Sequence, residues 1–106
     1  MIVRIWRGMA SRENADKYRE HFATSVCPEL ATLDGHRGAC LLRREAAGSV
    51  EFLAVTMWES LDAIRAFAGD RPETAVVEPA ARAVLADFEE VARHYEVAHT
   101  TGLKIG

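Results

Sequence analysis

Four side chains near the two ends of the chain are of types that could remove a proton from a small molecule and stabilise the resulting anion. His94 and Glu96 alternate near the C-terminus, and Arg4 and Trp6 alternate near the N-terminus. An imidazole or a carboxylate can accept the proton of a phenol, and a guanidinium can stabilise the phenolate. An indole offers a flat apolar surface for an aromatic ring. These residues predict a pocket that deprotonates an aromatic compound, provided that the fold brings the two chain ends together.

The spacing of apolar residues predicts such a fold. It indicates strands at 2–8, 36–45, 50–58 and 92–99, and helices at 11–24, 60–68 and 79–90. The order is β-α-β-β-α-β, the ferredoxin-like plan of an α+β fold, in which helices cover one face of an antiparallel sheet. Right-handed crossovers give the spatial strand order four, one, three, two. The last strand then lies beside the first, so the four side chains are expected to converge.

The sheet face away from the helices is also expected to be apolar and to need a cover. Alternation along the strands places four apolar residues there, together with the histidine and the carboxylate of the last strand. These four are Trp6, Phe52, Ala54 and Leu42. Tyr95 and Val97 are expected to lie under the helices instead. A second copy of the chain would cover the open face, so we expect a homodimer that encloses a cavity between two sheets.

Length, charge and cysteine content exclude several classes of function. A chain of 106 residues with 49% hydrophobic residues predicts one domain, at 1–100, with a flexible tail at 101–106. The net charge of −3 argues against nucleic-acid binding, and no apolar run is long enough to span a membrane. We therefore expect a cytoplasmic protein. Cys27 and Cys40 are interpreted as free thiols, and no metal or cofactor site is expected.

The segments IWRG, HRGACLLRRE, VEFLAVTMWESLDAIRAFAG and ARHYEV resemble the antibiotic biosynthesis monooxygenase family of dimeric α+β barrel proteins. The resemblance covers nearly the whole chain. It implies one of two chemistries, cofactor-independent oxygenation of polycyclic aromatic or phenolic compounds, or oxidative haem breakdown. The haem-degrading branch carries an Asn, a Trp and a His at positions that correspond here to Trp6, Phe67 and Val77. Because all three family residues are replaced, haem degradation is disfavoured.

The resulting hypothesis is a cofactor-free monooxygenase acting on a phenolic, quinol-like or anthrone-like compound. His94 would be the base, with Glu96 beside it, and Arg4 would bind the anion, with Arg44 as the second choice. Trp6 or Phe52 would hold the ring. The alternatives are that His94 makes only a structural polar contact, and that the protein is a non-catalytic dimer that binds a small hydrophobic ligand. Two other histidines, His21 on the first helix and His99 near the tail, are expected to be exposed to solvent.

Overall fold

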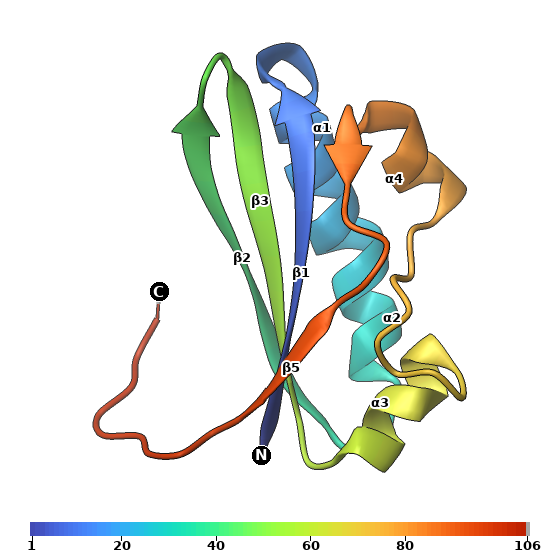
Figure 1. Ribbon diagram of the computed structural model, residues 1–106, viewed down its shortest axis with the longest axis vertical. Coiled ribbons are helices and arrows are strands. Elements are labelled where there is room, and N and C mark those ends of the chain that lie inside the picture. Colours follow the sequence, from blue (N-terminus) through green and yellow to red (C-terminus); the bar gives the residue numbers. More distant parts are fainter. Residues whose placement is uncertain (106) are drawn as a thin grey trace.

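The computed structural model describes residues 1–105, which form one antiparallel sheet with helices on one face (Figure 1). The strands are β1 (Ile2–Ser11), β2 (His36–Ala46), β3 (Ser49–Trp58), β4 (Asp87–Phe88) and β5 (Arg93–Glu96). The helices are α1 (Arg12–His21), a π-helical turn (Phe22–Val26), α2 (Cys27–Ala31), α3 (Leu61–Ala68) and α4 (Pro79–Val84). The predicted α+β, ferredoxin-like fold with helices on one face is confirmed.

The strand order is β2-β3-β1-β4, and β5 also pairs with β1. The last strand therefore lies beside the first, as predicted. Arg4 is directly opposite His94 in this register, and Ile2 is opposite Glu96. All pairings are antiparallel, and β1 contacts β3 along its whole length, from Ile2 to Ser11. The two chain ends are thus brought together by backbone pairing.

Local signals in the sequence set the element boundaries. The hydroxyl of Ser11 accepts a hydrogen bond from the backbone N–H of Asn14 and so caps α1. Ser60 caps α3 in the same way through the N–H of Ala63. Gly69, at φ +88°, ends α3 in a conformation that other residues rarely adopt. These caps fix where both helices begin, and Gly69 fixes where α3 ends.

The helix expected at 79–90 is shorter than predicted. Helix α4 ends at Val84, and Leu85 is already extended. The following residues form β4, where Phe88 pairs with Gly8 of β1. Strand β5 pairs only with the first part of β1, which leaves backbone groups further along that edge without partners. The chain turns back to the sheet because β4 forms hydrogen bonds with these groups. The prediction of a helix through this segment was wrong.

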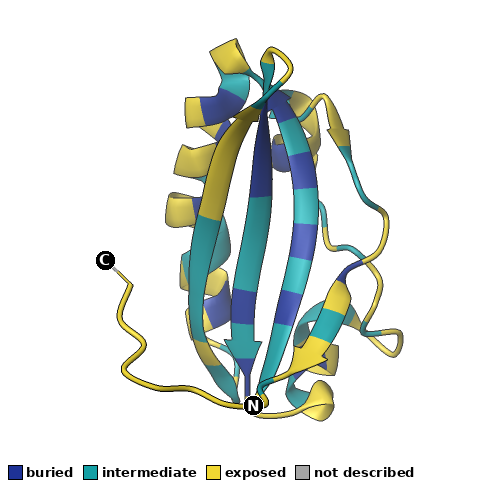
Figure 2. Ribbon diagram, turned by 60° about the vertical axis from the view of Figure 1, so that its left-hand side comes forward, coloured by how far each residue is buried: buried dark blue, intermediate teal, exposed yellow. Residues whose placement is uncertain are grey.

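The two faces of the sheet differ from the prediction. Along β1 the residues Arg4, Trp6, Gly8 and Ala10 are buried, and they alternate with half-buried neighbours (Figure 2). The buried set faces the helices, because Trp6 packs against Tyr18 of α1, with ring centroids 6.4 Å apart. Strand pairing puts Phe52 and Ala54 on this same face, opposite Gly8 and Trp6. The expectation that Trp6, Phe52 and Ala54 lie on the open face was therefore wrong.

The open face consists of the alternate residues of each strand. Its strand residues are mainly apolar, with the charged residues Arg7, Arg44 and Glu51 among them, and the expectation for Leu42, which is 47% exposed, was correct. Tyr95 pairs with Val3 on this face and is 51% exposed, so its predicted place under the helices was wrong. The members with apolar side chains on β1, β2 and β3 are Val3, Ile5, Met9, Cys40, Leu42, Leu53, Val55 and Met57. We refer to these residues, with Tyr95, as the open face.

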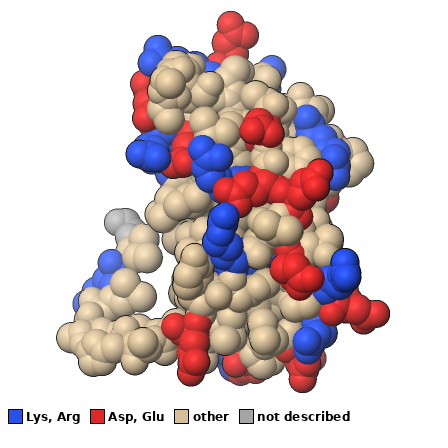
Figure 3. Space-filling view, in the orientation of Figure 1, with Lys and Arg blue, Asp and Glu red and all other residues tan. Residues whose placement is uncertain are grey.

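Acidic and basic side chains are interspersed over the surface that Figure 3 presents. Within residues 1–105, no helix combines the length and apolar character needed to cross a membrane. After β5 the chain runs away from the body on the open side of the sheet (Figure 1). Two large apolar side chains of this segment, Leu103 and Ile105, are 65% and 66% exposed.

Candidate functional site

The site is built around a buried cation, the guanidinium of Arg4 on β1. Its residue is only 3% exposed. One terminal nitrogen donates a hydrogen bond of 2.7 Å to the carbonyl oxygen of Thr74, and the other reaches the carbonyl of Pro72 at 3.5 Å. The guanidinium carbon also lies 5.5 Å from the ring centroid of Phe67. No carboxylate of residues 1–105 forms a salt bridge with it.

Burial lowers the pKa of Arg4 from 12.5 to about 10, so the side chain is still charged at neutral pH. A buried charge without a counter-ion is costly, and two carbonyl dipoles offset only part of that cost. An anion bound beside Arg4 would offset more. The position is therefore suited to hold a negative charge on a ligand.

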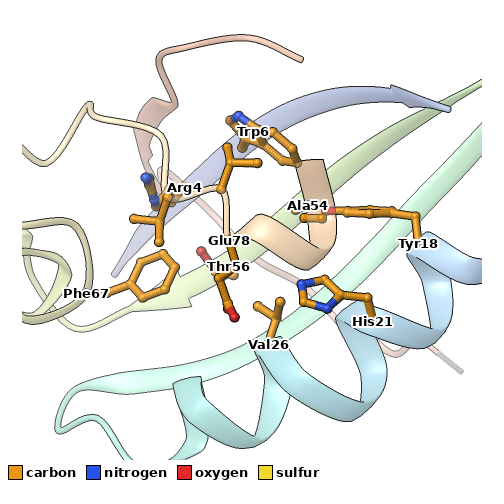
Figure 4. Close-up of a pocket in the computed structure, with 12 residues that line it drawn as sticks. Arg4, Trp6, Tyr18, His21, Val26, Ala54, Thr56, Phe67 and Glu78 are labelled. Carbon is orange, nitrogen blue, oxygen red and sulfur yellow. The ribbon is translucent and has the colours of Figure 1, made fainter. Parts of the chain in front are cut away.

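A small cavity lies beside this cation, between the sheet and the helices (Figure 4). Its volume is about 50 Å³. The wall is mainly apolar or aromatic and includes Trp6, Phe67 and Val77. The indole N–H of Trp6 is held by the carbonyl of Glu89 at 2.7 Å, which fixes the ring plane. The polar groups of the lining come from Arg4, Tyr18, His21, Thr56 and Glu78.

His94 and Glu96 share the helix-covered face with Arg4, but neither lines the cavity. Glu96 is exposed. The His94 imidazole is half-buried, and its Nε2 has no hydrogen-bond partner within residues 1–105. Burial lowers the pKa of His94, and the positive charge of Arg4 lowers it further, while the negative charge of Glu73 acts to raise it. The strand pairing thus puts the four predicted residues on one face of the sheet, the helix-covered face and not the open one that was expected, but only Arg4 and Trp6 line the cavity.

Phe52 and Arg44 are separated from this cavity. Phe52 is fully buried behind Tyr18, with ring centroids 5.0 Å apart, and it forms part of the core. Arg44 lies on the open face, where its Nε contacts the carboxylate of Glu51 at 2.5 Å. A hollow of about 370 Å³ lies beside it, between Leu42 and Leu53. This hollow is larger and more open to solvent, and its arginine already has a carboxylate partner, so we favour the smaller cavity at Arg4 as the site.

His21 is the site residue that the sequence analysis missed. It was expected to be exposed, but it is half-buried, and its ring lines the cavity across from Arg4 (Figure 4). Its Nε2 is buried and has no hydrogen-bond partner within the described chain. The apolar stripe of the first helix includes Tyr18, three residues earlier, and this spacing puts both side chains on one helix face. That spacing was the available signal.

The positions that correspond to the haem-branch residues all line this one cavity. Trp6, Phe67 and Val77 lie in its wall. The three positions that the resemblance singled out therefore lie together in one cavity, although their residue types differ from those of the haem-degrading branch. Elsewhere in residues 1–105, no group of three or more His, Cys, Asp or Glu side chains is arranged to hold a metal ion.

Comparison with known proteins identifies the family of the chain. The model of the antibiotic biosynthesis monooxygenase family matches residues 1–78, which include every cavity-lining residue except Ala81. No curated protein gives a significant match.

Three solved structures share the fold. A single-substitution variant of MhuD, solved with two manganese protoporphyrin IX molecules per active site, is 23% identical with a TM-score of 0.69, covering 96% of this chain and 99% of that chain. A Bacillus cereus protein described as an antibiotic biosynthesis monooxygenase is 14% identical with a TM-score of 0.68, covering 96% and 97%. A Deinococcus radiodurans protein with the same description is 16% identical with a TM-score of 0.67, covering 98% and 99%.

Proposed function

The chain belongs to the antibiotic biosynthesis monooxygenase family, and from this premise we propose that it is a cofactor-independent monooxygenase of small phenolic or anthrone-like aromatics. The observation that carries the proposal is the buried, carboxylate-free guanidinium of Arg4 at the edge of an aromatic cavity. A phenolate supplies both of the features that this site favours, a negative oxygen for Arg4 and a flat ring for the wall formed by Trp6 and Phe67.

The reaction needs only the substrate and dioxygen. Removal of a proton from an anthrone-like ring system gives an electron-rich anion, which can transfer an electron to dioxygen. The two radicals combine to a peroxide on the ring carbon, which takes the first proton back and becomes a hydroperoxide. The second hydrogen of that carbon then leaves as a proton while the O–O bond breaks, and water is released. One oxygen atom enters the product as a carbonyl and the other leaves as water. The protein stabilises the anion through Arg4 and excludes bulk water.

The size of the cavity requires that it opens when substrate binds. A cavity of about 150 Å³ holds benzene, whereas the one beside Arg4 measures about 50 Å³. The segment between α3 and α4 supplies Val76, Val77 and Glu78 to its wall. This segment is irregular, apart from one isolated bridge between Thr74 and Val91, and Val76 is 40% exposed. We propose that this segment moves outward to admit the ring.

We also propose a homodimer formed through the open face. That face presents half-buried and exposed apolar side chains that residues 1–105 leave uncovered, and Leu42 and Tyr95 are about half exposed. Two copies packed face to face would bury these side chains at the centre of the interface. In this arrangement each protomer keeps its own cavity on the far side of its sheet, rather than sharing one cavity between the sheets.

An oxygen electrode tests the proposed activity. Purified protein treated with a chelator should consume one dioxygen per anthrone oxidised, and 18O2 should label one oxygen of the product. Ligand-induced thermal stabilisation without oxygen uptake would favour the alternative of a non-catalytic binding protein. A shift of the haemin Soret band on titration would instead favour haem handling, the chemistry to which the protoporphyrin-bound MhuD structure points for that protein.

A further inference from the structure

We infer that His21 is the proton acceptor of the site, taking the acidic proton of the substrate (a phenolic O–H, or the ring C–H of an anthrone) on its Nε2; this inference rests on the proposed function and assigns a group in the same cavity. The first support is placement. The ring of His21 lines the cavity from α1, across from Arg4 on β1 (Figure 4). A phenol bound in this cavity would share it with a cation that can stabilise the anion and a base that can form it.

The second support is the unused nitrogen. The Nε2 atom of His21 is buried, and no group of residues 1–105 forms a hydrogen bond with it. Buried polar atoms are nearly always paired, and an unpaired one has a substantial desolvation cost. A substrate hydroxyl in the cavity would provide the missing partner, as donor to an unprotonated Nε2.

The third support is the backbone around His21. Helix α1 ends at this residue and continues as the π-helical turn Phe22–Val26, in which the N–H of Cys27 donates to the carbonyl of Phe22. In a regular α-helix, two residues five positions apart are separated by about 140° around the helix axis, so they point in different directions. The wider π-turn closes a bond over five residues and so brings positions five apart back to one side. His21 and Val26 both line the cavity as a result.

The other candidate bases fit less well. Burial, followed by the charge of Cys27, raises the pKa of Tyr18, so its hydroxyl is protonated at neutral pH. His94 shares a sheet face with Arg4, but its ring is not part of the cavity wall. Glu78 does line the cavity, and it is the competing acceptor that an experiment has to separate from His21.

The first experiment uses oxygen uptake with anthrone. His21→Gln and His21→Ala should each lower the turnover number by about 100-fold or more, which is the usual contribution of a general base. Added imidazole should restore part of the activity of His21→Ala, an effect that a merely structural role would not give. His99→Gln, which changes an exposed histidine of the tail, should match the wild-type protein.

The second experiment works without turnover and uses 4-nitrophenol, whose anion is yellow. Bound to the wild-type protein it should be largely ionised, and bound to His21→Gln it should be largely neutral. If this difference is seen but anthrone gives no oxygen uptake, the proposed function fails and the role of His21 stands. The inference is wrong if His21→Gln ionises the phenol and turns over anthrone as well as the wild-type protein does. It is also wrong if only Glu78→Gln or His94→Gln loses these activities, or if the wild-type protein does not bind the phenol.

Discussion

Replacing Arg4 by methionine should abolish anion binding without unfolding the protein. Burial lowers the pKa of this guanidinium from 12.5 to about 10. Since one pKa unit corresponds to about 1.4 kcal/mol, the charged form is disfavoured in the folded protein by roughly 3 kcal/mol. Methionine has a similar length and carries no charge, so it removes this cost.

The substitution also has a cost. The carbonyl of Thr74 loses its 2.7 Å hydrogen bond, and an unpaired buried carbonyl costs about 1–2 kcal/mol. The contact with the carbonyl of Pro72 is 3.5 Å long and contributes little. From these two opposing contributions we expect the free energy of unfolding of Arg4→Met to equal that of the wild-type protein or to exceed it by about 1–2 kcal/mol.

Urea unfolding and calorimetric titration with a phenol would measure both effects. Arg4→Met should unfold at the same or a higher urea concentration and should bind the phenol at least about tenfold more weakly, as expected for loss of a charged hydrogen bond. Arg7→Met is the matched control, because Arg7 lies on the same strand but contacts Glu51 on the open face. A loss of more than about 3 kcal/mol of stability with phenol binding intact would show that Arg4 is structural.

Three further predictions concern the rest of the fold. Leu53→Arg, which puts a charge on the open face, should convert the dimer to a monomer in sedimentation, whereas Leu61→Arg on α3 should not. Hydrogen bonds from its two arginine partners lower the pKa of Glu51 to about 2. The stability that its carboxylate contributes should therefore be present above pH 4.5 and lost as the pH falls from 4.5 towards 2. The stability of Glu51→Gln, followed through the same acid titration, should not show that loss. Gly35→Ala should destabilise the protein by roughly 2–3 kcal/mol in urea, because Gly35 has φ +85° and an added Cβ would lie 2.6 Å from that of Ala63; an unchanged midpoint would contradict this.

The sequence was sufficient to predict which strands pair, but not to keep all expected face neighbours together, since Leu42 lies on the opposite face from Trp6, Phe52 and Ala54. Alternation placed Arg4, Trp6, His94 and Glu96 together, and β1 and β5 do bring them to one side of the sheet. It was not sufficient to predict which side the helices cover. Both faces of β1 carry apolar residues, so apolar content alone cannot distinguish a helix-covered face from one that is open in the single chain.

Two other differences depend on contacts that are distant in the sequence. Tyr95 is of a type that is often found in protein cores, but its pairing with Val3 places it on the open face, where it is exposed. His21 follows charged residues on a helix, which is typical of a solvated position. Its spacing of three from Tyr18 and the packing of α1 over β1 turn its ring towards the cavity, and the π-turn after it adds Val26 to the same wall.

The central claim is that an aromatic anion binds between the sheet and the helices, beside Arg4. Chemical-shift mapping with a non-oxidisable phenol tests this location directly. The largest changes should occur at Arg4, Phe67 and Val77, and the amides of Leu42 and Arg44 should not respond. Changes centred on Leu42 and Arg44, with none at Arg4, would place the ligand on the open face and contradict the account.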